Sequence, residues 1–231
     1  MTIQKDWESE VRRVFDKIKS HKKEYITKIA DKEIIVLPNV FSPHYFTDSE
    51  WFVVTIPKII GKKSLLEIGT GTGIVALFAA LNGSKVVATD INPTAVKNAE
   101  LNFKKYNVNV KVLLGDMYKP LNINEKFDFI FWNHPFNKGI DPNEEILLKA
   151  GFDYQYNSLI NYIKGAKGHL TERGKLLLGT GNFALLSEIK TLAKEMNYDM
   201  ILLEMVKIPL AADSSIDNDY RIYELRKKLG S

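Results

Sequence analysis

Four consecutive residues in this sequence have the types needed for chemistry: Asn133, His134, Pro135 and Phe136 follow directly on the apolar run of residues 127–132. A strand that ends in this tetrapeptide would present a side-chain amide and a backbone carbonyl side by side. Both groups accept hydrogen bonds, and Phe136 adds a flat face on which a planar group can stack. The tetrapeptide therefore indicates a site that holds a planar amine or amide.

Planar nitrogen groups are poor nucleophiles because their lone pair is delocalised into the π-system. Asn133 Oδ1 and the backbone carbonyl of His134 could each accept one N–H bond and so favour localisation of the lone pair. Pro135 has a fixed φ and restricts the preceding residue to extended conformations, which sets the direction of that carbonyl. The chemistry that fits is catalysis by positioning, which can contribute roughly 7–11 kcal/mol in favourable cases.

His134 has two interpretations, a general base or a bystander that contributes only its backbone carbonyl. If the carbonyl points into the site, the side chain points away from it. A strong base is also unnecessary, because the nitrogen can lose its proton after attack has made it cationic. We therefore favour the second interpretation.

A glycine loop in residues 65–76 forms a second candidate site, between a short apolar run and the start of a second one. Glycines let a ligand approach the backbone closely, and free amides at the start of a helix favour polar or anionic groups. Gly71, Gly73 and Ala76 satisfy the dinucleotide pattern G-x-G-x-x-G/A, so the loop could bind NAD. A glycine turn that binds no ligand is the remaining alternative.

Glu67 favours a different cofactor. Together with Gly69, Thr70, Gly71 and Gly73 it forms the pattern E-x-G-x-G-x-G, which is associated with S-adenosylmethionine (SAM). A dinucleotide brings a pyrophosphate that needs bare amides, whereas SAM has no phosphate and carries a sulfonium and an ammonium group. A carboxylate just before the loop suits those cations, so we expect SAM.

Two more carboxylates end the next two expected strands. Asp90, followed by Ile91, lies about 20 residues beyond the loop, where a carboxylate can accept hydrogen bonds from ribose hydroxyls. Asp116 is placed to reach an adenine amine, and Met117 to pack on the adenine ring. Ligands of doubly wound sheets lie across the carboxyl ends of the strands, so these residues and Asn133 should surround one cofactor.

Apolar patterns predict alternating strands and helices from residue 64 onward, which indicates a mostly parallel sheet covered on both faces. No helix separates the last two expected strands, so they should form an antiparallel pair. The predicted strands are 33–37, 64–69, 85–90, 110–116, 126–133, 174–181, 199–210 and 220–228, and the predicted helices are 3–19, 22–30, 48–60, 73–83, 92–107, 157–170 and 183–196.

The bulk composition limits the class of protein. The 231 residues are 45% hydrophobic and 26% charged, as in ordinary folded proteins, and no apolar run is long enough to span a membrane. Without cysteine, and with four scattered histidines, the chain offers no thiolate or helical zinc site, and we expect no metal. The net charge of +4 permits an anionic partner, but basic and acidic residues are mixed as on a solvated surface. The start of the chain lacks the apolar core of a signal peptide, so we expect a cytoplasmic monomer.

Residues 64–137 resemble class I SAM-dependent methyltransferases, and residues 133–136 resemble the Asn-Pro-Pro-Tyr/Phe motif of their amino-methylating branch. That branch includes release-factor glutamine methyltransferases and the adenine and guanine amino-methyltransferases of DNA and RNA. The resemblance implies a Rossmann-like α/β fold with seven strands, helices on both faces and an antiparallel last strand. It also implies SAM bound by Glu67, the glycine loop, Asp90 and Asp116, and catalysis at residues 133–136.

Residues 90–102 and 151–163 look most like the glutamine-methylating group, but two features depart from it. Position 134 is His rather than Pro, at a place where related rRNA adenine dimethyltransferases carry Leu or Ile. Residues 1–60 also look too short for the helical bundle of the release-factor enzymes. We expect them to form an extension that covers the cofactor site, with residues 61–231 as the methyltransferase domain.

These observations predict a SAM-dependent N-methyltransferase that acts on a planar amide or amino nitrogen, in a protein glutamine side chain or a nucleobase. Three alternatives stay open: an NAD-dependent oxidoreductase that uses Gly71, Gly73 and Ala76, a small-molecule N-methyltransferase, and a SAM-binding protein without catalysis. The choice among acceptors should depend on the N-terminal region and on residues 137–157.

Overall fold

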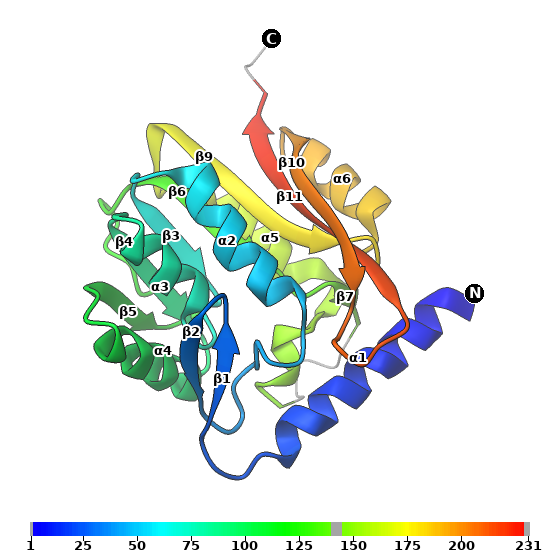
Figure 1. The fold of residues 1–231 in the computed structure, drawn as a ribbon. Coiled ribbons are helices and arrows are strands. Elements are labelled where there is room, and N and C mark those ends of the chain that lie inside the picture. The colour runs from blue at the N-terminus through cyan, green and yellow to red at the C-terminus, as the bar shows by residue number, and fades with distance from the viewer. Residues whose placement is uncertain (1, 140–144, 229–231) are drawn as a thin grey trace.

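The computed structural model describes residues 2–139 and 145–228, and its centre is a seven-stranded sheet in the order β10-β11-β9-β6-β3-β4-β5 (Figure 1). β9, β6, β3, β4 and β5 are parallel, whereas β11 is antiparallel to both of its neighbours, β9 and β10. The predicted fold class is confirmed. The strands of this sheet are β3 (Leu65–Ile68), β4 (Val86–Asp90), β5 (Val110–Leu114), β6 (Phe127–Asn133), β9 (Leu170–Gly181), β10 (Tyr198–Pro209) and β11 (Asp217–Lys227).

Helices cover both faces of the sheet (Figure 1). Two separate two-stranded sheets accompany it, the antiparallel β1–β2 hairpin and the parallel β7–β8 pair. The helices are α1 (Thr2–Ser20), α2 (Asp48–Ile60), α3 (Ile74–Leu81), α4 (Pro93–Lys105), α5 (Asn157–Ala166) and α6 (Leu186–Glu195), with 3-10 turns at Leu148–Ala150 and Tyr154–Tyr156. The short strands are β1 (Tyr25–Ile29), β2 (Lys32–Val36), β7 (Asn137–Lys138) and β8 (Phe152–Asp153). None of the helices in the described residues is long and apolar enough to cross a membrane.

Strict alternation along the central strands divides the core into two layers. Leu66, Ile130 and Leu176 lie in register across β3, β6 and β9 and belong to the layer that also contains residues of α1, α5 and α6. Phe131 and Leu177, one residue further on, point to the opposite layer with α2 and α3. All five are fully buried, and each contributes about 1.5–3 kcal/mol by leaving water. These central strands hold the site rigidly.

The predicted helix at residues 22–30 is wrong, because this segment forms β1 and pairs with β2 in an antiparallel hairpin. Thr27 and Ile29 point inward while Ile26 and Lys28 are exposed, so the segment follows the period of a strand. The hairpin turns at Ala30 and Asp31, whose φ angles of 43° and 70° give the left-handed geometry that short hairpins use.

Two fully buried asparagines of α4 join the N-terminal hairpin to the glycine loop. Asn98 Oδ1 accepts the backbone N–H of Leu37 at 2.7 Å, and Asn102 Oδ1 accepts that of Ile35 at 2.9 Å. The amide of Asn102 also donates to the carbonyl of Thr72 at 2.9 Å. Buried backbone groups that lack partners are costly, so this network fixes the free edge of β2 against the loop.

The strand order reverses between β3 and β6, and this reversal creates the place for a ligand. The chain moves from β3 outward to β4 and β5, then returns to place β6 on the other side of β3. The connections at the carboxyl ends of β3 and β6 therefore diverge and leave a crevice between them. The glycine loop follows β3, and Asn133 is the last residue of β6.

We predict that Gly73→Ala destabilises the protein by about 2–4 kcal/mol in urea unfolding, because two costs add up. Gly73 has φ 82°, and a Cβ at this position would lie 2.8 Å from both Ala99 Cβ and Phe103 Cζ. Gly71 is the matched control, since its φ is 56° but its Cβ would meet nothing within 4 Å. Gly71→Ala should cost only about 1–2 kcal/mol; equal losses would show that packing at Gly73 contributes nothing.

Candidate active site

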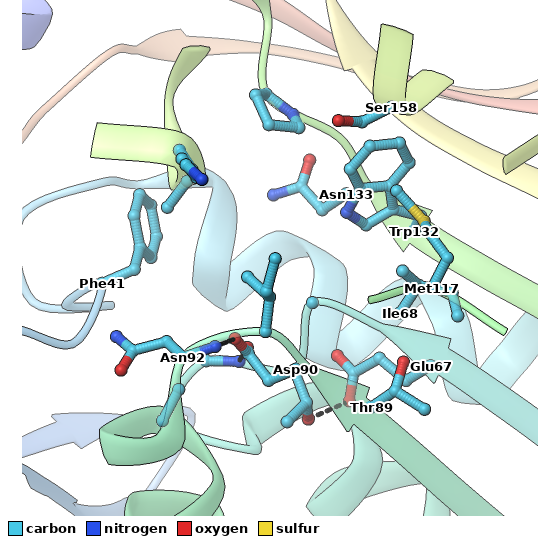
Figure 2. A pocket seen from close by; sticks show the side chains of 18 of the residues that line it. Phe41, Glu67, Ile68, Thr89, Asp90, Asn92, Met117, Trp132, Asn133 and Ser158 are labelled. Carbon is cyan, nitrogen blue, oxygen red and sulfur yellow. Dashed lines mark hydrogen bonds between the residues drawn. The ribbon is translucent and has the colours of Figure 1, made fainter. Parts of the chain in front are cut away.

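A cavity of about 420 Å³ opens at the carboxyl ends of β3, β4 and β6 (Figure 2). In Figure 2, Glu67 and Asp90 lie on one side of it and Trp132 and Asn133 on the other. The predicted site residues that line it are Glu67, Gly69, Thr70, Gly71, Asp90, Ile91, Asp116, Met117, Asn133 and Pro135. Three do not: Gly73, His134 and Phe136. Gly73 instead precedes α3 and closes the loop by donating to the Thr70 carbonyl at 2.8 Å.

The Glu67 side chain accepts hydrogen bonds from the glycine loop and from the start of α3. Its Oε2 accepts the hydroxyl of Thr70 at 2.6 Å and the backbone N–H of Ala76 at 3.1 Å. The side chain is only 4% exposed, and this burial raises the pKa of Glu67 to about 8 against the two hydrogen bonds that lower it. The nearby Asp90 carboxylate raises the pKa of Glu67 further. A cation in the cavity would relieve this cost by favouring the ionised form.

Asp90 connects the glycine loop to the start of α4. One carboxylate oxygen accepts the backbone N–H of Gly71 at 2.8 Å, and the other accepts that of Asn92 at 2.8 Å. Burial raises the pKa of Asp90, and these backbone donors lower it in part. Each carboxylate oxygen has a second lone pair, so Asp90 retains acceptor capacity toward the cavity that it lines.

The residues after β4 and β5 form an apolar rim with one acidic group. Ile91 is 44% exposed although it is a large hydrophobic residue that lines the cavity. Met117, which follows β5, also lines the cavity and adopts a φ of 52°. Asp116 is partly exposed and forms an ion pair with Lys119 at 2.7 Å. An apolar rim with few polar groups is typical of sites for flat ring systems.

Asn133 ends β6 with one side of its amide bound and the other free. Its Nδ2 donates to Asp48 Oδ2 at 3.0 Å, whereas its Oδ1 is buried and has no hydrogen-bond partner among the described residues. Asp48, the first residue of α2, is 4% exposed, and burial raises its pKa to about 6. Nothing in the local sequence indicates this contact, which joins residues 85 positions apart.

The His134 side chain is turned away from the large cavity. Its ring is 2% exposed, lies among Trp132, Phe136 and Tyr156, and bonds through Nε2 to the Thr180 hydroxyl at 2.9 Å. Burial lowers the pKa of His134 to about 3, so the imidazole is neutral at physiological pH. This geometry agrees with the interpretation that the side chain is no base.

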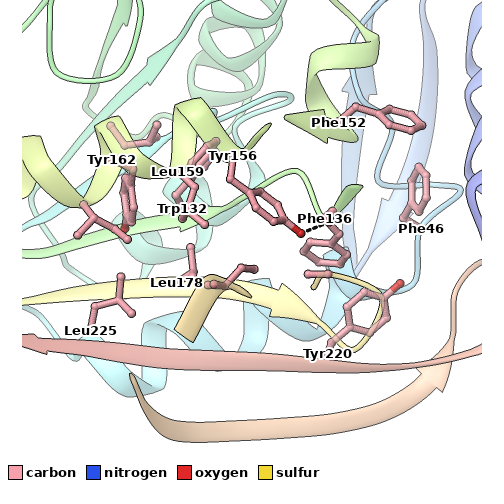
Figure 3. Packing of buried hydrophobic residues seen from close by; sticks show 14 of the residues in the cluster. Phe46, Trp132, Phe136, Phe152, Tyr156, Leu159, Tyr162, Leu178, Tyr220 and Leu225 are labelled. Carbon is pink, nitrogen blue, oxygen red and sulfur yellow. Dashed lines mark hydrogen bonds between the residues drawn. The ribbon is translucent and has the colours of Figure 1, made fainter. Parts of the chain in front are cut away.

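Phe136 lies in the core rather than in the large cavity (Figure 3). It is 9% exposed, its ring is 6.5 Å from that of Trp7, and its carbonyl accepts the hydroxyl of Tyr156. It lines a second, smaller cavity of about 40 Å³ together with Asp48, Asn133 and residues of α1. A planar acceptor therefore does not meet the Phe136 ring from the large cavity in this conformation.

Residues 145–158 form a wall of the large cavity, in part of the segment whose role could not be predicted from the sequence. Asp153 accepts the backbone N–H groups of Ser158 and Leu159, at 3.0 and 2.9 Å, and so orders the start of α5. Ser158 and Asn157 thereby face the cavity as further polar groups. Residues 140–144 of the predicted segment lie outside the described residues.

We predict that Glu67→Gln stabilises the protein increasingly as pH rises from 4.5 to about 8. The native pKa of Glu67 is raised from 4.5 to about 8, so the folded state holds a proton that the unfolded state releases. Stability from this group is full below pH 4.5 and is lost through that window, by up to about 5 kcal/mol. The side-chain oxygen of Gln can accept the same two hydrogen bonds, and because Gln does not ionise, the variant does not lose this stability as pH rises. Melting temperatures at pH 4.5 and 8 test this; an equal gain at both would contradict it.

Two proteins with assigned names are similar to this chain in sequence. A Methanocaldococcus jannaschii protein with the provisional name protein N5-glutamine methyltransferase is 36% identical over 97 residues, 41% of this chain and 48% of that protein. The ribosomal RNA small subunit methyltransferase C of Haemophilus influenzae is 30% identical over 159 residues, 67% of this chain and 43% of that protein. The chain thus spans less than half the length of either relative.

Solved structures show the same fold at low sequence identity. A T. thermophilus 16S rRNA N2 G1207 methyltransferase, in complex with AdoMet and guanosine, has a TM-score of 0.62 at 17% identity over 89% of this chain and 50% of its own. A Pyrococcus furiosus methyltransferase has a TM-score of 0.57 at 20% identity over 95% of this chain and 98% of its own. The model of the methyltransferase small domain family matches residues 31–200, most of the chain, and the protein therefore belongs to that family.

Proposed function

We propose that this protein is a SAM-dependent N-methyltransferase that acts on a planar amide or amino nitrogen. The observation that carries the proposal concerns Asn133: this residue lines a cavity bounded by the glycine loop and by Glu67 and Asp90, and its buried Oδ1 has no hydrogen-bond partner among the described residues. An acceptor without a donor is available to take a hydrogen bond from an N–H group that a ligand brings. Membership of the methyltransferase small domain family supports the reaction class.

The carboxylates support a cationic cofactor. Glu67 and Asp90 are buried and lack an ion pair with Lys or Arg among the described residues. The sulfonium and ammonium groups of SAM would offset that charge, whereas the pyrophosphate of NAD would add to it. When bound, SAM supplies the methyl group. Asp90 would accept ribose hydroxyls, and Asp116 and Met117, which line the same cavity, would hold the adenine.

The acceptor would be a protein glutamine or a nucleobase amine, since one relative is named for protein N5-glutamine and the other for ribosomal RNA, and a solved structure of the same fold is named for N2 of G1207 in 16S rRNA. The protein's part in the reaction is to accept an N–H bond of the acceptor at Asn133 Oδ1. His134 does not line the large cavity, so the role predicted for its carbonyl is not part of this proposal. Held in this way, the nitrogen would face the methyl group that SAM supplies; the sulfur–methyl bond would break as the nitrogen–carbon bond forms, leaving a neutral thioether, and the nitrogen would then lose its proton. We also propose that residues 1–60 form an extension that helps cover the cofactor, because Phe41, Pro43 and Ser49 line the cavity.

We predict that Asn133→Ala lowers the turnover number for methyl transfer by about 100-fold or more, because the attacking nitrogen loses its oriented acceptor. The dissociation constant of SAM, measured by calorimetry, should change little. Tritiated methyl transfer into fractionated lysate, with nuclease and protease controls, measures the activity and identifies the class of acceptor.

Asn82→Ala is the matched control, because Asn82 donates to the carbonyls of Pro57 and Gly61 at the opposite end of the sheet. It should lose stability but not turnover. Calorimetry with NAD tests the oxidoreductase alternative. Binding of NAD without binding of SAM would overturn the proposed function, and full activity of Asn133→Ala would overturn the mechanism.

A further inference from the structure

The orientation of the Asn133 amide is set by Asp48, a residue from a different element. An asparagine amide presents a donor on one side and an acceptor on the other, and the two orientations are nearly equal in shape. An ionised carboxylate only accepts hydrogen bonds, so Asp48 Oδ2 at 3.0 Å requires Nδ2 of Asn133 on its side. The reversed amide would bring two oxygens together and would present N–H groups to the acceptor nitrogen.

We propose that Asp48 is a positioning residue for methyl transfer, whose carboxylate holds the Asn133 amide with Oδ1 free for the acceptor nitrogen. This inference rests on the proposed function. Asp48 Oδ1 and Asn133 Oδ1 are both buried without a donor in the described part of the chain, and both residues line the 40 Å³ cavity. Two such oxygens are costly for stability alone, which supports a role in holding a ligand's N–H group.

The orientation should depend on pH. The groups that face Asp48 are Asn133 from β6, Ser49 from its own helix and the Tyr220 phenol from β11, whose pKa is raised partly by Asp48. No cation is among them. Below the Asp48 pKa of about 6, the protonated carboxyl can donate to Asn133 Oδ1 and remove the preference for the productive amide orientation.

Asp48→Asn tests this role because it keeps the shape and removes the charge. We expect the turnover number to fall about 10- to 100-fold, with the SAM dissociation constant unchanged within about 3-fold. Activity of the wild type should decline as pH falls through about 6, and the variant should lack this decline. Glu50→Gln, an exposed carboxylate in the same first turn, should leave both unchanged.

An activity-independent readout keeps this test separate from the proposed function. The side-chain amide resonances of Asn133 should titrate near pH 6 in the wild type and not in Asp48→Asn. Absence of that titration, or wild-type turnover and pH profile in Asp48→Asn, would overturn the positioning role. If SAM fails to bind while the amide titrates, the proposed function fails and the contact between Asp48 and Asn133 stands.

A second, independent observation concerns charge. Residues 17–32 contain six lysines against one glutamate and one aspartate, an excess of +4 that equals the net charge of the whole chain. The remaining sequence is therefore balanced. Lys17, Lys19 and Lys28 have acidic partners, whereas Lys22 and Lys23 are exposed between them. The basic excess is thus local rather than spread over the surface.

Four rings lie beside these lysines and form what we call the aromatic platform: His21, Tyr25, His44 and Tyr45. His21 stacks on Tyr25 with centroids 4.1 Å apart, and His44 packs edge-on against Tyr45 at 4.8 Å. The His21 ring bonds to the Tyr45 hydroxyl, and His44 bonds to Thr27 at 3.0 Å. His44 is exposed and the other three rings are partly exposed. Hydrogen bonds hold these rings at the surface instead of in the core.

The aromatic platform adjoins the candidate active site. His44 and Tyr45 belong to the loop between β2 and α2, in which Phe41 and Pro43 line the large cavity. In Figure 1 the β1–β2 hairpin lies at the end of the sheet toward which β3 points. We infer that the aromatic platform and Lys22 and Lys23 bind single-stranded nucleic acid, so that the methyl acceptor is a nucleobase. Rings stack on bases and lysines neutralise phosphates; the nucleobase clause rests on the proposed function.

Binding of a labelled single-stranded RNA oligonucleotide, measured by fluorescence anisotropy, tests this surface. We expect the double substitution Lys22→Glu and Lys23→Glu to weaken binding at least 10-fold and to reduce its salt dependence. The matched control changes Lys62 and Lys63 to Glu, an exposed lysine pair just before β3 at the opposite end of the sheet. It should bind as the wild type does.

Single-stranded DNA of equal length and an acidic peptide are the comparison probes. Stronger binding of the peptide, equal losses in both double variants, or no RNA binding by the wild type would overturn the proposal and favour a protein acceptor. The assay needs no methyl transfer. Loss of SAM binding would therefore remove the proposed function without touching the result for the aromatic platform.

Discussion

Buried carboxylates that lack a basic partner are the constraint on which this site depends. Glu67, Asp90 and Asp48 are each at most 8% exposed, and desolvation raises the pKa of all three. In the described residues their hydrogen bonds come from backbone N–H groups, hydroxyls and one amide rather than from lysine or arginine. A fold under no functional demand would gain stability by replacing them. Under the proposed function, Glu67 and Asp90 would face a cation in the large cavity, whereas Asp48 contacts Asn133.

The parallel sheet makes such a group of carboxylates tolerable. Consecutive parallel strands end at the same edge, where the loops and helix starts expose N–H groups that have no partner within a helix. The N–H groups of Gly71 and Asn92 bind Asp90, and that of Ala76 binds Glu67. The same bonds fix the glycine loop, and Asn102 connects this loop to the N-terminal hairpin. Hydrogen bonds therefore connect Glu67 and Asp90, through the glycine loop, to the N-terminal hairpin.

The sheet and its order of motifs could be predicted because each central strand repeats the pattern that packing on two faces requires. Leu66, Ile130 and Leu176 face one layer and their neighbours the other, which the alternation of strands and helices already implied. The helix predicted for residues 22–30 was wrong because the apolar spacing of this segment suits a helix as well as a strand. Pairing with β2 makes it a strand. The contact between Asp48 and Asn133 was beyond prediction, since each residue has an ordinary local role and only the fold brings them together.

The side chains of His134 and Phe136 point away from the large cavity, which limits the roles that the tetrapeptide can have. His134 is neutral, buried and bound to Thr180, so it is not placed to accept a proton from an acceptor in the large cavity. Phe136 lies under Trp7, which itself stacks on Phe183 at 4.1 Å, so α1 closes that side. The apolar groups beside Asn133 that face the large cavity belong to Pro135 and Trp132. Under the proposed function, this end of β6 would therefore orient N–H bonds and would not abstract a proton.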